Sequence, residues 1–334
     1  MYRKLQDVTL KSGERMELGV LLGPEQGKLA REVRDLLAHK GRIWQWQINQ
    51  SLDKQFQDAQ SRFYIALRDG KPLANVMTVE AFGLGIFGHV FTRPEERRKG
   101  LADKIIGSLM ADFRARGGKA LYLGTGFDST AYHIYARHGF KSIEPQSGRM
   151  AWFAQSRKTL EAEVFAPAPV RRETLSFEHW PTLPALTMVR HPAHLRVATM
   201  EIFGPASTEG GALPLLMAMN KETDCSKWEG GRAQVAVSEK SGAPVAIACA
   251  MPEHVFWKQV DVLDVFCAPG FEGELQPLAE RLQLSAGRAA ICYADSLWPA
   301  RQEVLRALGF RQAAVLPRFF LVRENPHDVE LWIR

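Results

Sequence analysis

The sequence has no long apolar run and only four cysteines among 334 residues. No apolar stretch approaches the roughly 20 residues that a membrane-spanning helix needs, so we expect no membrane partner. The segment from Met1 to Asp7 has no apolar core of a signal peptide, which predicts a cytoplasmic location. The cysteines lie far apart in the second half and form no metal-ligand pair. We therefore expect no metal site and reduced core thiols at Cys225, Cys249, Cys267 and Cys292.

The motifs of several enzyme classes are also missing. The chain has neither a G-x-S-x-G nucleophile elbow nor a P-loop, and His191 and His194 have too few companions for a metal site. A literal G-x-G-x-x-G runs from Gly83 to Gly88, but it leads into a strand instead of a helix, which argues against a dinucleotide fold. The net charge of +6 is clearest in the loop at residues 93–99, without alternating aromatic residues. A polyanionic small molecule is therefore expected there, and no nucleic acid.

The most informative stretch runs from His89 to Ala102. An apolar run breaks at Pro94, passes through a basic loop and becomes an amphipathic segment after Gly100. Three cations precede the first helical turn, whose free N–H groups and dipole favour an anion. The residues alone leave two interpretations equally open, a pyrophosphate site and a solvated basic turn. The apolar residues at helical spacing are Leu101, Ile105, Ile106, Leu109 and Phe113.

Two segments together carry a family resemblance. Arg97-x-x-Gly100-x-Ala102 resembles the acyl-CoA pyrophosphate loop of the GNAT superfamily of N-acyltransferases. The segment from Asp128 to Phe140 is similar to the second signature of that family. The two occur in the expected order, with a helix and a strand predicted between them. The resemblance implies an α/β (mixed α+β) fold, in which a central mixed sheet is flanked by helices.

The same resemblance assigns roles to residues. Tyr135 matches the position whose hydroxyl serves the leaving sulfur of CoA. The base is open between Glu80, His89, His133 on the segment of Tyr135, and a relay through water, because the strand at residues 121–125 carries no carboxylate. Trp44 and Trp46 are expected to line the acceptor site, with packing at a core edge as the alternative. The residues expected to bind the cofactor are Phe91, Thr92, Arg97, Arg98, Lys99, Gly100, Leu101, Ala102 and Asp128.

The second half of the chain repeats the pattern of the first but lacks its chemistry. Its loop is acidic at Glu272 and Glu274, and Leu305 stands at the place of Tyr135. We therefore predict a catalytic GNAT-like domain at 1–160 and a degenerate second copy at 170–334. The repeated segments are 232–246 after 62–74, 265–269 after 90–94, and 308–310 after 138–140.

These features predict an N-acetyltransferase that transfers an acetyl group from acetyl-CoA to an amine of a small molecule by direct attack. Two alternatives stay open: a CoA-binding sensor or accessory module with little turnover, and an N-acetyltransferase of proteins or peptides. An enclosed pocket at Trp44 and Trp46 favours a small molecule, and an open groove favours a peptide. Because the duplicated copy is tethered to the first, we expect a monomer.

Overall fold

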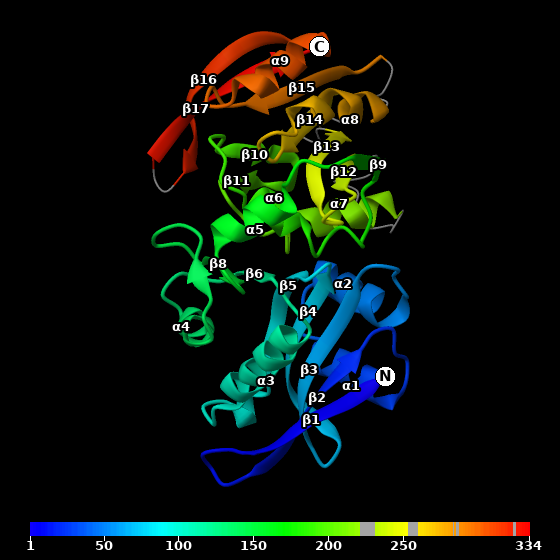
Figure 1. Cartoon of the computed structure of the whole chain (residues 1–334), viewed down its shortest axis with the longest axis vertical. Coiled ribbons are helices and arrows are strands. Elements are labelled where there is room, and N and C mark those ends of the chain that lie inside the picture. Colours follow the sequence, from blue (N-terminus) through cyan, green and yellow to red (C-terminus); the bar gives the residue numbers. More distant parts are fainter. Residues whose placement is uncertain (221–230, 253–259, 283, 285–286, 323–324) are drawn as a thin grey trace. The chain divides into compact units, whose positions relative to one another are not determined.

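The computed structural model describes residues 1–220, 231–252, 260–282, 284, 287–322 and 325–334 (Figure 1). The chain divides into two compact units, Met1–Leu160 and Glu161–Arg334. Each unit contains one large mixed sheet with helices, which confirms the predicted fold class. Among the described residues, no helix combines the length and the apolar character needed to cross a bilayer.

The sheet of the first unit has the strand order β1-β2-β3-β4-β5-β6-β8-β7. Only β5 and β6 pair in parallel, and the other neighbours are antiparallel. No apolar pattern in the sequence marks β1, because it is an edge strand without a buried residue. The strands are β1 (Tyr2–Thr9), β2 (Arg15–Leu22), β3 (Gln60–Arg68), β4 (Lys71–Ala81), β5 (Leu84–Thr92), β6 (Ala120–Gly124), β7 (Lys141–Ser142) and β8 (Arg149–Phe153).

Helices cover the first sheet according to the alternation of its strands. Tyr64 and Ala66 belong to one core cluster with the apolar side of α3. Phe63 and Ile65 point to the opposite face and are also fully buried, and α1 contacts β4. Each such buried side chain stabilises the fold by roughly 1.5–3 kcal/mol. The helices are α1 (Lys28–Leu36), α2 (Arg42–Asp53), α3 (Leu101–Ala115), α4 (Thr130–Arg137) and, across the boundary of the units, α5 (Arg157–Val164).

The ends of α3 follow from local sequence. Gly100 adopts φ 82°, a left-handed conformation that glycine takes without strain, and α3 begins at the next residue. At the other end Arg116 is the C-cap, and Gly117 follows with φ 77°. The expected start after Gly100 is therefore confirmed, and α3 ends just before the Gly117-Gly118 pair.

The second unit has a sheet of order β16-β17-β15-β14-β13-β12-β9 and a separate pair, β10 with β11. Here too one pair, β14 with β15, is parallel. The strands are β9 (Val170–Thr174), β10 (Leu195–Val197), β11 (Ile202–Phe203), β12 (Arg232–Ser238), β13 (Pro244–Pro252), β14 (Val260–Cys267), β15 (Ala289–Ala294), β16 (Arg311–Val322) and β17 (Asn325–Ile333). The helices are α6 (Leu183–Thr187), α7 (Ala212–Met219), α8 (Leu275–Arg281) and α9 (Pro299–Ala307).

The two sheets share their order and sense of pairing. Strands β3-β4-β5-β6-β8-β7 correspond one by one to β12-β13-β14-β15-β17-β16, and the parallel pair falls at the same place. This agreement supports the internal duplication, which stays a prediction. Cys249, Cys267 and Cys292 are buried free thiols, as expected, whereas Cys225 lies outside the described residues.

Candidate functional site

The basic loop lies between β5 and α3. Residues Pro94–Glu96 form a short 3-10 turn, and Arg98 and Gly100 both have left-handed backbones, with φ 64° and 82°. The side chains of Arg97 and Arg98 are exposed, and Arg97 donates from Nε to the carbonyl of Thr92, 3.1 Å away. The free N–H groups at the start of α3 follow directly. This arrangement is suited to binding a phosphate group.

Lys99 differs from the two neighbouring arginines because it is held by acids. Its Nζ lies 2.9 Å from Glu96 and 3.0 Å from Glu14. Arg68 bridges the same two carboxylates, at 2.6 Å from Glu96 and 3.0 Å from Glu14. Glu96 is only 3% exposed, and the hydrogen bonds from Lys99 and Arg68 lower its pKa. Lys99 thus anchors the loop to the β1–β2 turn, and Arg97 and Arg98 are the loop cations left exposed.

The two parallel strands of this unit stop pairing part-way along β5, and we call the interval beyond that point the slot. The pairing of β5 with β6 covers Leu84 to Ile86 and Ala120 to Tyr122, whereas β5 runs on to Thr92. From Phe87 onward, β5 has no ladder partner on this side. Phe91 and Thr92 lie in the unpaired part, next to the basic loop. Backbone groups in this position can pair with an extended amide-containing ligand, as a strand added at a sheet edge does.

Tyr135 lies where these strands diverge. It belongs to α4, which begins after Ser129, whose Oγ accepts a hydrogen bond from the Tyr132 amide at 3.1 Å. The ring of Tyr135 meets that of Phe87 edge-on, with centroids 5.2 Å apart. Phe87 is the first residue of β5 beyond the parallel pairing. The side chain of Tyr135 is therefore packed at the opening, with 8% of its surface exposed.

On the other side of β5, His89 meets helix α2. The backbone of His89 has φ 49°, at a register shift between β4 and β5, and its carbonyl accepts a hydrogen bond from Asn75 Nδ2 at 3.0 Å. Its ring packs edge-on against Trp44, with centroids 5.3 Å apart. Nε2 lies 2.5 Å from Oε1 of Gln47, which is fully buried.

The hydrogen-bond network fixes the proton on His89. The amide nitrogen of Gln47 donates to Ser51 Oγ at 2.9 Å and points at Met77 Sδ, which can only accept. Oε1 of Gln47 must then accept from His89, so Nε2 carries the proton and Nδ1 carries the lone pair. Burial, with the charges of Lys40 and His39, lowers the pKa of His89 to about 3, and the ring is neutral at pH 7.

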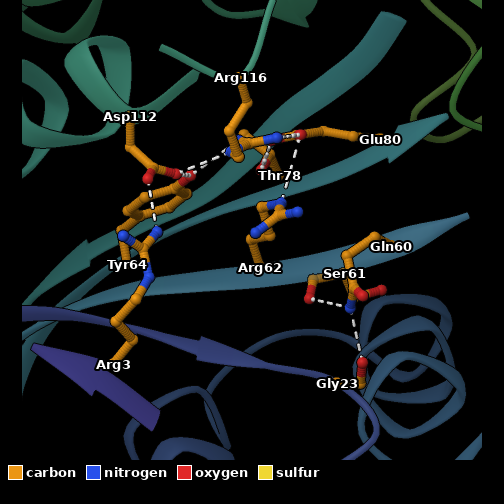
Figure 2. Close-up of polar contacts among 10 residues, drawn as sticks. All are labelled: Arg3, Gly23, Gln60, Ser61, Arg62, Tyr64, Thr78, Glu80, Asp112 and Arg116. Atoms are coloured by element: carbon orange, nitrogen blue, oxygen red, sulfur yellow. Dashed lines mark hydrogen bonds and ion pairs between the residues drawn. The ribbon is translucent and has the colours of Figure 1, made fainter. Parts of the chain in front are cut away.

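Glu80, the other candidate base, belongs to a network on the α3 face (Figure 2). Arg116 donates to both of its carboxylate oxygens, at 2.6 and 3.1 Å, and Arg62 lies 3.3 Å away. Glu80 pairs across from Gly85, whereas His89 is four residues further along β5, roughly 13 Å at the rise of a strand. The two candidates are therefore not brought together, and Glu80 is occupied by two cations.

The same network continues to the first strand. Asp112 on α3 accepts from Tyr64 at 2.7 Å, from Arg3 at 2.5 Å and from Arg116 at 3.0 Å, as Figure 2 shows. Although burial acts in the opposite direction, these hydrogen bonds lower the pKa of Asp112 to about 2. The network fastens the C-terminal end of α3 to β1, β3 and β4.

The remaining predicted residues lie further out or deeper in. Asp128 is exposed with φ 57°, and its carboxylate pairs with His133 at 2.9 Å. Trp44 and Trp46 are two positions apart on α2 and so point in different directions. Trp46 is buried, and Trp44 contacts His89. No group of three or more metal-ligating side chains occurs in the described part of the chain.

Sequence reasoning overlooked Glu96 and Gln47. Glu96 carried a usable signal, because it precedes Lys99 by three residues within an otherwise basic loop. Gln47 carried a weaker one, a polar residue on the buried side of an amphipathic helix. Both matter because they set the orientation of a predicted site residue.

The corresponding place in the second unit is filled by the chain itself. Pairing of β14 with β15 stops at Val262, and beyond it the guanidinium of Arg301, 1% exposed, donates to carbonyls of both strands. These are Val265, at 2.6 and 3.0 Å, and Tyr293, at 3.3 Å. Further donations reach the carbonyls of Leu195 at 2.8 Å and Arg196 at 2.6 Å.

The loop before α8 is acidic, as predicted from the sequence. Glu272 accepts a hydrogen bond from the Gly270 amide at 2.9 Å, and Glu274 pairs with Arg172 at 2.6 Å. Leu305, at the place of Tyr135, is fully buried.

Comparison with known proteins gave one family. Residues 59–142 match the family model described as acetyltransferase (GNAT) domain. The chain is similar to a phosphinothricin acetyltransferase of Sinorhizobium meliloti in complex with AcCoA, at 21% identity over 41% of this chain and 74% of that chain, with a TM-score of 0.32. It is also similar to an N-acetyltransferase of Staphylococcus aureus Mu50, at 11% identity over 50% and 98%, with a TM-score of 0.38.

A third similar structure is a variant of spermidine N-acetyltransferase from Vibrio cholerae. It is 12% identical over 49% of this chain and 92% of that chain, with a TM-score of 0.36. No curated protein matches the chain.

Proposed function

We propose that the first unit, whose residues 59–142 match the model of the acetyltransferase (GNAT) domain, transfers the acetyl group of acetyl-CoA to an amine of a small molecule. The observation that carries this proposal is the stretch of β5 from Phe87 to Thr92, which pairs with β4 but not with β6 and has the basic loop at one end and Tyr135 beside it. A pantetheine arm fits the slot as an added strand, and its pyrophosphate fits Arg97, Arg98 and the start of α3.

The residues of the chain then have separate tasks. Bound acetyl-CoA supplies an acetyl thioester, which a neutral amine can attack directly. We assign Tyr135 the donation of a proton to the leaving sulfur, and an acid in this role contributes about 10²-fold to 10⁴-fold. His89 offers the lone pair of Nδ1 to the attacking amine. Because its pKa is about 3, His89 is a weak base; in this proposal it accepts a hydrogen bond that orients the amine, and water takes the proton.

We assign Glu80 a positioning role, since its carboxylate is occupied by Arg116 and Arg62. The second unit does not take part in cofactor binding in this proposal, because Arg301 fills the equivalent opening. The protein is proposed to act as a monomer, which light scattering at working concentration tests directly.

Calorimetry with acetyl-CoA, followed by an assay of amine-dependent thiol release, tests the function. We expect one site per chain. Arg98→Glu should weaken binding by about 10-fold or more, because Arg98 has no hydrogen bond or ion pair within the described chain and is free to contact a phosphate. Arg31→Glu, an exposed charge reversal on α1, is the matched control and should leave the affinity unchanged.

Two equivalent sites, or an Arg98→Glu protein that binds like the control, would refute the assignment of the site. Binding without thiol release for any amine would instead favour a sensor with little turnover.

A further inference from the structure

The segment that joins α1 to α2 forms a wall beside His89, which we call the α1–α2 wall: His39, Lys40, Trp44 and Gln47. His39 stacks on Phe91 of β5 with ring centroids 4.1 Å apart, and Trp44 contacts His89. Gln45 fixes the connection by donating to the Leu37 carbonyl at 2.6 Å. The wall is thus built against the strand that carries the proposed slot.

The charge of this wall is one-sided. Residues 38–52 contain His39, Lys40 and Arg42 but no aspartate or glutamate. Of the two nearest acidic residues in the sequence, Asp53 pairs with Arg34 at 2.6 Å, and Asp35 is exposed to solvent.

Lys40 is the unusual member. It is half-buried, and its ammonium forms no hydrogen bond or ion pair within the first unit, all of whose residues are described. Burial lowers the pKa of Lys40, and no carboxylate opposes that effect. A partly buried cation without an acid is costly unless a ligand supplies the opposite charge. The charge of Lys40 contributes to the lowered pKa of His89, and Lys40 directly follows His39, whose ring packs on Phe91 of the strand that carries His89.

The ring nitrogen Nδ1 of His89 also favours a bound acceptor at this wall. Gln47 occupies Nε2, and Nδ1 has no hydrogen-bond partner in the described chain. An acceptor reaching this atom would have its other end near Lys40 and the rings of Trp44 and Phe91.

We infer that the acceptor is an amine that also carries an anionic group, a carboxylate or a phosphonate, which Lys40 binds while the amine approaches Nδ1 of His89. This inference rests on the proposed function. A polyamine would bring a second positive charge to a wall that has no carboxylate to receive it, and like charges at this distance repel. Trp44 and Phe91 supply apolar surface for a short carbon skeleton between the two polar groups.

Matched acceptors test the inference. Alanine, ethylamine and 1-aminoethylphosphonate, and likewise phenylalanine and phenethylamine, differ only in the anionic group. We expect kcat/KM, followed by thiol release from acetyl-CoA, to be at least about 10-fold higher for the acid-bearing member of a pair. Calorimetry on the full chain saturated with CoA should show the same preference in Kd, whether or not turnover occurs.

Lys40→Met should reduce this preference about 10-fold, and Lys54→Met is its matched control. Lys54 is exposed at the far end of α2 and forms no ion pair, so removing its charge should leave the preference intact. A preference that favours the carboxylate over the phosphonate, or the reverse, identifies which anion is bound.

Equal kcat/KM and equal Kd within each pair would overturn the inference while leaving acetyl transfer standing. A loss of acetyl-CoA affinity in Lys40→Met would also overturn it, because Lys40 would then serve the cofactor. Absence of thiol release with every amine would count against the proposed function, and the calorimetric comparison would still decide on the anionic group.

Discussion

Two parallel strand pairs, β5 with β6 and β14 with β15, open in the same way and are filled differently. Counted back from the Gly-Phe pairs at 139–140 and 309–310, the residue at the same distance is Ala131 in the first unit and Arg301 in the second. The two Gly-Phe pairs are also bonded alike. The backbone amides of Phe140 and Phe310 donate to the carbonyls of Tyr135 and Leu305, at 3.2 and 2.9 Å. A small side chain leaves the first opening free, whereas a buried guanidinium joins the strands across the second. Preserving a fold and preserving its ligand site are therefore separate requirements.

The largest expected effect concerns Tyr135, the residue whose counterpart is Leu305. Tyr135→Phe removes the hydroxyl and little volume, so acetyl-CoA should still bind while kcat falls by about 10²-fold to 10⁴-fold. Thiol release measures kcat, and calorimetry measures affinity. Tyr132→Phe, which removes a hydroxyl bonded to Ser142 at 2.9 Å on the same helix, is the control. Unchanged kcat would make Tyr135 a packing residue like Leu305.

Removing the side chain that fills the second opening should destabilise that unit. Arg301→Met leaves four backbone carbonyls without their donor and removes the cation 4.0 Å from buried Asp264. We expect a loss of about 3–5 kcal/mol in the free energy of unfolding by urea. Arg306→Met on the same helix, at an exposed position, should cost much less. Calorimetry should still find one acetyl-CoA site, since the acidic loop remains; a second site would contradict the comparison.

The reverse exchange should close the first opening. Ala131→Arg places a long cation where the pantetheine arm is proposed to lie, and acetyl-CoA affinity should fall by about 100-fold, or 2.7 kcal/mol. Ala136→Arg adds the same group on an exposed face of α4 and serves as the control. If both variants bind acetyl-CoA like the parent chain, the cofactor does not occupy this slot.

The smallest effect is a pH dependence. His89 and Asp264 hold matching positions, and burial shifts both pKa values toward the neutral form, to about 3 for His89 and upward for Asp264. Below its ordinary pKa of about 6.5, His89 is protonated only in the unfolded chain, so its contribution to stability is lost as pH falls from about 6.5 toward 3. The slope is at most about 1.4 kcal/mol per pH unit.

Urea unfolding at pH 7, 6 and 5 measures this slope. His89→Asn, which keeps a donor for Gln47 but cannot titrate, should show a flatter dependence than the parent chain. Parallel curves for the parent and His89→Asn would show that His89 is not protonated differently on folding.

The sequence predicted what depends on near neighbours in the chain. Pro94 and Gly100 mark the loop and the start of α3, and the apolar spacing after Gly100 gives its buried side. It could not predict partners that only folding brings close. Glu14 reaches Lys99 across 85 residues, and Gln47 reaches His89 across 42, with no local pattern to announce either pair.

The same limit explains the base candidates and the tryptophans. Glu80 and His89 lie on neighbouring strands, but alternation and register put them on opposite faces of the sheet and at different heights. Trp44 and Trp46 are close in sequence, yet the helical twist of α2 separates their directions. The sequence could not predict that Arg301 bonds across the opening between β14 and β15, because it shows a charged residue on a helix and not the carbonyls that surround it.

The anchoring of α3 at Arg116 has a mechanical consequence. A helix of 15 residues is a stiff rod about 22 Å long, so tilting it at one end moves the other. The N-terminal end of α3 presents free N–H groups to the basic loop. Its direction depends on the ion pairs at the C-terminal end, where Asp112 and Glu80 pair with Arg3 and Arg116. Substitutions in these ion pairs would therefore affect catalysis from a distance. Random mutagenesis screened for altered acetyl-CoA affinity should recover them together with substitutions in the loop itself.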